Sequence, residues 1–189
     1  MIASEIILVR HAEPIPAEPA SSDAFENDRP LSEAGLLAAQ SLGATLAHLP
    51  ITAVFSSPHR RAIETIGPIA AARDLGVRVD DDLRERRLAD THLTGEEFVE
   101  ALRRARKDSS FRLPGGETTD EVLQRAMRAC RRMTSSVSDG IVLAGTHGGL
   151  ISIVRWSLGE DFSVEDALRE PMPALYRFPP FVEDPHHFR

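Results

Sequence analysis

Short apolar runs alternate along the chain with longer segments in which apolar residues recur at a helical period. Apolar runs of about four to eight residues indicate strands, whereas a period near 3.6 residues indicates helices. The runs predict five strands, at residues 5–9, 52–55, 77–80, 141–145 and 175–178. The fourth run has no polar position, which favours a central strand covered on both faces. The fifth alternates between apolar and polar residues, as an edge strand does.

The longer segments predict five helices. They cover residues 32–49, 58–74 and 95–107, a segment that begins after Thr118, and a segment that begins after His147. Thr118 and Glu121 have the spacing of a capping box, and Pro58 suits a first helical position. Strands that alternate with helices in this way predict an α/β fold around a mainly parallel sheet. Residues 12–30 and 111–117 fit neither element and are predicted to be loops.

Composition narrows the class of protein further. The length of 189 residues predicts a single domain over residues 1–189. The formal net charge of -7 argues against a nucleic-acid or acidic-membrane partner. Cys130 is the only cysteine, which excludes an intrachain disulfide, and no apolar run approaches the ~20 residues of a membrane span. We therefore expect a cytoplasmic protein without a membrane partner, and the sequence leaves its oligomeric state undetermined.

Chemically active side chains follow four of the predicted strands. In an open parallel sheet, ligands bind outside the carboxyl ends of the strands, so these side chains are expected to meet at one edge. The first strand is followed by an arginine and a histidine, the second by a histidine and two arginines, the third by a glutamate, and the fourth by a histidine and two glycines. In chain order they are Arg10, His11, His59, Arg60, Arg61, Glu85, His147, Gly148 and Gly149.

These residue types suit a phosphoryl group. Guanidinium groups match phosphate oxygens and keep their charge, and a helix start made approachable by glycine adds backbone donors. A neutral imidazole can attack phosphorus and form a phosphohistidine, while a carboxyl group can protonate the departing alkoxide. The chain has no GxxxxGK loop and no evident aspartate pair for a metal. We therefore expect side chains to supply the positive charge.

The segments "LVRHAE", "SSPHRRAIET", "LRER" and "AGTHGGLI" resemble, in this order, the histidine phosphatase superfamily, the phosphoglycerate mutase-like group. "DRPLSEAG" and "PGGET" resemble segments between those motifs in its bacterial members. The resemblance runs from Glu5 to about Leu158. It implies a three-layer α/β/α sandwich around a mainly parallel sheet, and no metal or organic cofactor. The sequence leaves a small metabolite, a nucleotide, a sugar phosphate and a phosphoprotein open as substrates, and the expected cytoplasmic location favours a phosphorylated small molecule.

The resemblance also implies roles at matching positions. His11 is the nucleophile that becomes phosphorylated, and Arg10 binds the phosphoryl oxygens beside it. The family's arginine before alanine is Arg61 here, so Arg60 is not carried over. Glu85 matches the acid that protonates the leaving group and then activates water. His147 matches the second histidine of the phosphate pocket, expected to act as a cation, with Gly148 at the adjoining helix start; His59 is expected only at the rim.

Three alternatives to a phosphatase remain. A phosphoglycerate mutase would return the phosphoryl group to another hydroxyl, but the continuation "ERRLADTHLTGEEF" lacks a tyrosine and a glycine where mutases of this group have them. A metal-dependent oxygenase would use His11, Glu85 and His147 as ligands, which the neighbouring Arg10 and Arg61 disfavour. A non-catalytic binding relative would not need all these side chains. Substrate choice is expected to come from residues 12–30, residues 86–115 and the tail near 179–180.

Overall fold

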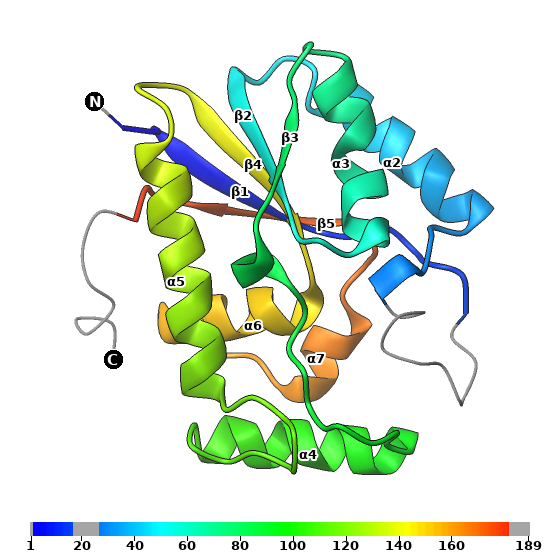
Figure 1. Cartoon of the computed structure of the whole chain (residues 1–189). Coiled ribbons are helices and arrows are strands. Elements are labelled where there is room, and N and C mark those ends of the chain that lie inside the picture. The colour runs from blue at the N-terminus through cyan, green and yellow to red at the C-terminus, as the bar shows by residue number, and fades with distance from the viewer. Residues whose placement is uncertain (1, 17–26, 182–189) are drawn as a thin grey trace.

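The structure is a computed structural model and describes residues 2–16 and 27–181. Its centre is a five-stranded sheet in the order β3-β2-β4-β1-β5 (Figure 1). The strands are β1 Glu5–Arg10, β2 Ile51–Ser56, β3 Val77–Val79, β4 Ile141–Thr146 and β5 Ala174–Phe178. Four strands are parallel, and only β5 runs antiparallel, against β1 at the edge. The mainly parallel sheet and the edge position of the last strand are confirmed.

Strand β4 lies at the middle of this sheet, and all six of its residues are buried. It has no polar alternation because helices cover both of its faces. Its register pairs Thr146 with Arg10 on β1 and Gly145 with Ser56 on β2. The last residues of three parallel strands therefore lie side by side, which brings the segments that follow them to one edge.

Helices cover the two faces of the sheet and make three layers (Figure 1). Ile7 and Val9 of β1 face a core formed with α2 and α3, while Ile6 and Leu8 face a core formed with α5 and α6. This alternation of inward positions is the period of two of a strand buried on both faces. The helices are α2 Glu33–Thr45, α3 Arg60–Ala71, α4 Gly95–Lys107, α5 Thr119–Ser135, α6 Gly148–Ser157 and α7 Val164–Arg169.

Three helix boundaries and one element differ from the sequence prediction. Helix α3 begins at Arg60 and not at Pro58, because His59 is its extended N-cap. Helix α3 ends at Ala71, three residues before the predicted end. Helix α2 ends at Thr45, four residues before the predicted end. Helix α7 was not predicted; it is only six residues long and is started by a capping box on Ser163. The predicted capping box on Thr118 is present at the start of α5.

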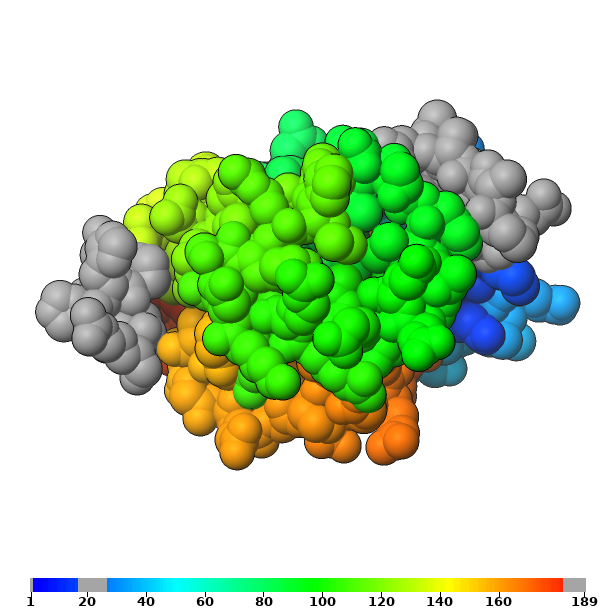
Figure 2. Space-filling model, turned by 90° about the horizontal axis from the view of Figure 1, so that it is seen from below, coloured from blue at the N-terminus to red at the C-terminus, as the bar shows by residue number. Residues whose placement is uncertain are grey.

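Helices α4 and α7 lie outside the three layers, beyond the carboxyl ends of the parallel strands (Figure 1). Seen from below, residues of α4 and its neighbours form the middle of this face, and residues around 160–170 adjoin them (Figure 2). They belong to the connections after β3 and β4, which begin at the same edge of the sheet as the residues that follow β1 and β2. Among the described residues, no helix is long and apolar enough to cross a bilayer.

Candidate active site

The strand ends assemble the site through backbone hydrogen bonds. The N–H of His11 donates to the carbonyl of Thr146 at 3.0 Å, and the N–H of Ser57 donates to the carbonyl of Gly145 at 2.8 Å. His147 follows directly after β4. The residues after β1, β2 and β4 are thus fixed side by side by the continuation of the sheet ladder, as the strand order requires.

The ring of His11 is held in one orientation. Its Nδ1 lies 2.8 Å from the carbonyl oxygen of Ala12, and the side chain is only 7% exposed. A carbonyl oxygen can only accept, so Nδ1 carries the proton and Nε2 keeps its lone pair. Nε of Arg61 donates to this Nε2 at 3.3 Å. Burial lowers the pKa of His11 to about 3, with the positive charges of Arg61 and Arg10 adding to the effect.

Arg10 connects the site to the segment around α7. Its Nη1 donates to the carbonyl of Glu170 at 2.8 Å and to that of Ala167 at 3.4 Å. Its Nε is buried and has no hydrogen-bond partner among the described residues. A Cβ at Gly148 would lie 3.1 Å from this Nε, so glycine leaves the guanidinium room beside the start of α6. A buried donor of this kind needs an acceptor, and an anion supplies one.

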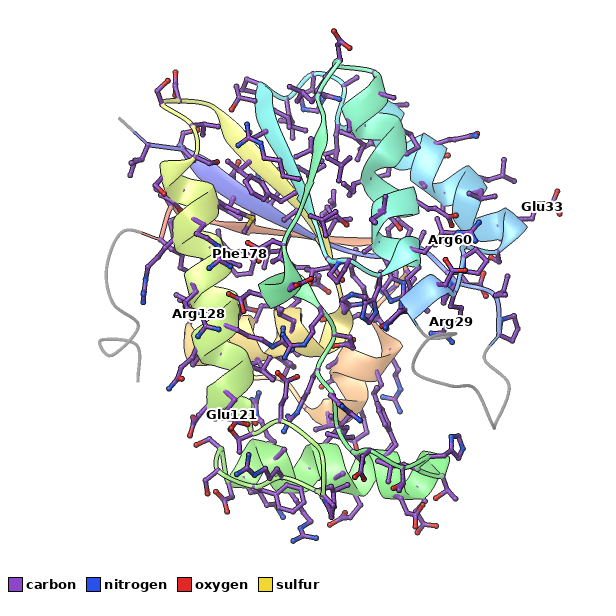
Figure 3. All side chains as sticks on the ribbon, viewed as in Figure 1. Arg29, Glu33, Arg60, Glu121, Arg128 and Phe178 are labelled. Carbon is purple, nitrogen blue, oxygen red and sulfur yellow. The ribbon has the colours of Figure 1, made fainter. Side chains whose placement is uncertain are left out.

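Arg61, and not Arg60, reaches the site. Arg61 is 4% exposed, and its Nη2 lies 3.5 Å from Nδ1 of His147 while its Nε contacts His11. Arg60 is exposed and pairs with Glu64 at 2.7 Å. Arg29 lies on the same side of the molecule as Arg60 (Figure 3), and its charge also lowers the pKa of His11 through electrostatic repulsion of the protonated ring. The sequence analysis assigned no role to Arg29.

His147 differs from its predicted charge state. Burial, followed by the charge of Arg61, lowers its pKa well below the ordinary value, so the imidazole is neutral near pH 7. Because Arg61 can only donate, Nδ1 of His147 accepts and Nε2–H donates to Oγ of Ser57 at 2.7 Å. The ring lies edge-on to His11, with centroids 5.2 Å apart. With these residues alone His147 is therefore neutral, whereas the resemblance implies a cation.

Ser57 and His59 lie behind His147. Oγ of Ser57 also accepts from the N–H of His59 at 3.2 Å, so one hydroxyl joins the start of α3 to the histidine after β4. The ring of His59 lies 4.7 Å from that of His147. Burial lowers its pKa to about 4. His59 was expected at the rim, but it packs directly against a site residue, and Ser57 was not singled out at all.

Glu85 lies at the N-terminus of α6. Its Oε2 accepts from the N–H of Gly149 at 3.3 Å, and its Oε1 accepts from the N–H of Arg86 at 2.8 Å. A helix N-terminus favours a negative charge. A Cβ at Gly149 would lie 2.5 Å from Oε1 of Glu85, so only glycine admits the carboxylate in this position without a shift.

Arg125 on α5 holds the segment that carries Glu85. It is 2% exposed, forms an ion pair with Glu117 at 2.9 Å, and donates to the carbonyls of Asp82, Arg84 and Glu85 at 2.9, 2.7 and 3.2 Å. The sequence analysis missed it among the many arginines of this helix. Its spacing from Val122 and Ala129 is the available signal, because it places Arg125 on the buried face.

A cavity of about 220 Å³ opens at this edge of the sheet, and Arg10, His11, Glu85, Gly148 and Gly149 are part of its lining. His11, Arg10 and Glu85 thus reach one cavity from the ends of β1 and β3, while Arg61 and His147 lie outside its lining and Arg61 contacts both histidines. Within the part of the chain that the structure describes, no group of three or more His, Cys, Asp or Glu side chains is arranged to hold a metal ion. This disfavours the oxygenase alternative, which needs His11, Glu85 and His147 as a set of ligands.

The family model of the histidine phosphatase superfamily (branch 1) matches residues 6–174. The chain therefore belongs to this superfamily, and the sequence resemblance is confirmed. Solved structures agree on the fold. A mycobacterial glucosyl-3-phosphoglycerate phosphatase superposes with a TM-score of 0.74 at 23% identity, covering 92% of each chain. A phosphoglycerate mutase from Thermus thermophilus superposes with a TM-score of 0.63 at 26% identity, covering 92% of this chain and 91% of the other.

Curated relatives match over shorter stretches. A fructose-2,6-bisphosphatase TIGAR from Xenopus tropicalis is 36% identical over 107 residues, which are 52% of this chain and 38% of the relative. A bifunctional protein of Mycobacterium tuberculosis is 38% identical over 104 residues, which are 51% of this chain and 28% of the relative. The chain thus spans well under half the length of the curated relatives that it matches. The relatives include both phosphatases and mutases.

Proposed function

We propose that this protein hydrolyses a phosphate monoester through a phosphohistidine on Nε2 of His11, without a metal ion. The observation that carries the proposal is the orientation of the His11 ring. The carbonyl of Ala12 holds the proton on Nδ1, and the other nitrogen presents its lone pair to Arg61. A pKa lowered to about 3 by burial keeps this lone pair unprotonated through the acid range. A nucleophile for phosphorus needs such a lone pair.

The surrounding donors suit the phosphoryl group. Arg61 donates to Nε2 of His11, and Arg10 and Gly148 at the start of α6 line the same cavity as His11. A planar guanidinium can bind two phosphate oxygens at once, and the backbone N–H groups at a helix start can bind others. A phosphoryl dianion beside His147 would raise the pKa of that ring, because an opposite charge favours the protonated form. His147 would then act as the cation that the family resemblance implies, but only while phosphate is bound.

The reaction has two displacements. In the first, Nε2 of His11 forms a bond to phosphorus, the ester P–O bond breaks, and Glu85 gives its proton to the departing oxygen. In the second, water attacks the phosphohistidine, Glu85 takes the proton from the water, and the P–N bond breaks to release inorganic phosphate. One carboxyl group serves both steps because its protonation state after the first step is the one the second requires.

A mutase is the nearest alternative. It would use the same first displacement and then transfer the phosphoryl group to a second hydroxyl instead of water. The missing tyrosine and glycine after Glu85 favour the phosphatase. Phosphorylation of an acceptor acid by a phosphoglycerate, in excess of hydrolysis, would decide for the mutase.

The deciding experiment is hydrolysis of p-nitrophenyl phosphate by the wild type, His11→Ala and His48→Ala. His48 is exposed at the end of the segment after α2 and serves as a matched histidine control. We expect His11→Ala to lose at least about a thousandfold in kcat, because it removes the nucleophile, while His48→Ala keeps full activity. Wild-type activity should survive a chelator, and rapid acid-free quenching should trap one phosphate on His11. Turnover that persists in His11→Ala, or that stops with chelator, would refute the proposal.

A further inference from the structure

The cavity beside His11 is built mostly from apolar side chains on connections outside the sheet. Helix α4 supplies three of them, α6 two and α7 three, and two more come from the segments before α4 and α7. They are Phe98, Leu102, Ala105, Ile153, Trp156, Val164, Ala167, Leu168, Leu88 and Phe162. Since Arg10, His11 and Glu85 line the same cavity, the apolar walls form the space next to the reacting group and not a separate pocket.

Most polar side chains of these walls already have partners within the protein. Oγ1 of Thr119 donates to the carbonyl of Ala105 at 3.0 Å, and Oγ of Ser163 donates to Asp166 at 2.6 Å. The guanidinium of Arg106 lies over the rings of Trp156 and Phe162, at 4.9 and 5.0 Å from their centroids. Ser152 also lines the cavity, and the stacked guanidinium of Arg106 keeps its N–H donors, so one hydroxyl and one guanidinium remain as polar groups among walls that are otherwise apolar.

The cations of the walls are also partly balanced. Arg106 faces Asp161 at 3.8 Å. Arg86 donates to the carbonyl of Glu117 at 3.0 Å and to Thr119 at 3.3 Å, and the carboxylate of Glu117 lies close enough to act on its charge. The buried Nε of Arg86, next to Glu85 along the chain, has no partner among the described residues. It provides one donor for an ester oxygen, which is much less than a second phosphate group requires.

We propose that the substrate's leaving group is an uncharged apolar alcohol, aromatic or branched aliphatic, and not a sugar, a carboxylate-bearing acid or a second phosphate ester. This inference rests on the proposed function. Hydroxyl and carboxylate groups need hydrogen-bond partners when they are buried, and the walls offer few. A cavity of about 150 Å³ with apolar walls holds a benzene molecule, so 220 Å³ admits one ring with its linking carbon. The leaving group departs as the neutral alcohol, with the proton that Glu85 donates.

Helix α4 closes this space from below. Phe98, Leu102 and Ala105 recur on one of its faces at helical spacing and line the cavity, while the opposite face forms part of the surface seen in Figure 2. In this proposal the apolar face of α4 contacts the leaving group, as do the lining side chains of α6 and α7. This also gives residues 86–115 the role in substrate choice that the sequence analysis expected.

The test compares two primary phosphate esters of similar size, benzyl phosphate and glycerol 3-phosphate. We expect kcat/KM to be roughly a hundredfold higher for benzyl phosphate, since several apolar contacts of a ring each favour it in such a pocket. Glycerol is the more acidic alcohol and the better leaving group, so chemical reactivity alone predicts the opposite order. Equal values or a preference for glycerol 3-phosphate, with turnover still dependent on His11, would overturn the inference and leave the proposed function intact.

Two variants distinguish an effect on the cavity wall from a general loss of structure. Leu102→Gln places an amide in the wall, and Leu36→Gln makes the same change at an exposed position on α2. We expect Leu102→Gln to lower kcat/KM about tenfold for benzyl phosphate with little change for glycerol 3-phosphate, and Leu36→Gln to change neither. Equal losses on both substrates would mean a structural defect and would count against the inference.

Binding tests the cavity without catalysis. Benzylphosphonate cannot be hydrolysed, and calorimetry should show that it binds more tightly than methylphosphonate, with the difference reduced in Leu102→Gln. If no phosphate ester is turned over in a His11-dependent way, the proposed function fails. The apolar site is then still supported by a benzylphosphonate preference, or refuted by its absence.

Discussion

Gly149 decides where the carboxylate of Glu85 can lie. Its N–H binds Oε2 of Glu85, and a Cβ there would come within 2.5 Å of Oε1. We predict that Gly149→Ala displaces this carboxylate and lowers kcat about tenfold or more, because a misplaced general acid loses much of its contribution. The measurement is the steady-state rate on p-nitrophenyl phosphate.

Gly67→Ala is the matched control for that prediction. Gly67 also lies inside a helix, and a Cβ there meets no atom within 4 Å. It should leave kcat unchanged and raise helix stability slightly, as alanine does in a helix interior. A Gly149→Ala enzyme as fast as Gly67→Ala would mean that Glu85 does not depend on this position.

At this scale the sequence predicted the residues that stand at strand ends, and it missed those whose importance depends on packing. His11, Arg61 and Glu85 lie together because the order of the motifs follows the order of the strands. Ser57 and Arg125 act through their contacts with other residues. Nothing in the local sequence says that an arginine of α5 will point at the carbonyls of a segment 40 residues earlier, since that depends on how α5 lies against the sheet.

At the scale of elements, α5 holds the connection after β3 through Arg125. We predict that Arg125→Lys lowers kcat with little change in KM, because lysine cannot donate to Glu117 and to three carbonyls together. The same substitution in a Glu85→Gln background should cause no further loss if Arg125 acts by positioning Glu85. The measurement is a double-mutant cycle on kcat, taken well below the melting temperature of each variant.

Arg128→Lys is the control on the same helix. Arg128 is exposed on α5 (Figure 3) and pairs with Asp82 at 3.0 Å, so it contacts the same connection from outside. It should leave kcat unchanged, because exposed ion pairs contribute little. Additive losses for Arg125→Lys and Glu85→Gln would refute the positioning role and leave Arg125 as a structural residue only.

The elements themselves were predicted well where the pattern is long. Helix α4 has the predicted bounds, and the predicted capping box at α5 is present. Helix α4 has a capping box on Thr94 that the sequence analysis did not predict. Helix α7 was not predicted because six residues are too few to show a helical period of apolar positions. Ser163 and Asp166 do have the spacing of a capping box. The start of α3 was predicted two residues early because Pro58 suits a helix start, yet His59 takes the extended N-cap conformation. Residues 17–26 of the predicted loop lie outside the described residues.

At the scale of the whole molecule, several buried histidines make stability depend on pH. The pKa of His11 is lowered to about 3 and that of His59 to about 4, mainly by burial, and burial also lowers that of His147. The unfolded chain takes up these protons near pH 6.5. Stability from this source is therefore fully present above that pH and is lost as the pH falls, because the unfolded state then binds more protons.

We predict that lowering the pH from 7.5 to 5.5 reduces the free energy of unfolding by roughly 1 kcal/mol for each of the buried His11 and His147. The contribution of His59 should be smaller, because this ring is only partly buried and solvent screens it. Urea unfolding at the two pH values measures the difference. In His59→Gln, the change in unfolding free energy between the two pH values should be smaller than in the wild type by the contribution of His59. Equal unfolding free energies of the wild type at both pH values would contradict the low pKa values of these buried rings.

The candidate catalytic residues were easier to predict than the cavity walls because the two come from different parts of the fold. The candidate catalytic residues follow strands whose order is fixed by the fold. The cavity walls come from α4, α6 and α7, whose relative placement depends on packing between connections and has no sequence motif. The sequence placed substrate choice partly in residues 86–115 but gave no view of the apolar character of the space that they enclose.

The hydrogen bonds from Arg10 to the carbonyls of Ala167 and Glu170 bear on how this protein can change over evolution. Ala167 is part of the cavity wall, so a substitution that moves this end of α7 also moves the guanidinium that we propose binds phosphate. Helix α4 receives no hydrogen bond from Arg10 among the described residues. New substrates are therefore most easily acquired through mutations on α4, and chains descended from this one should vary there while the stretch around Ala167 to Glu170 keeps its backbone course.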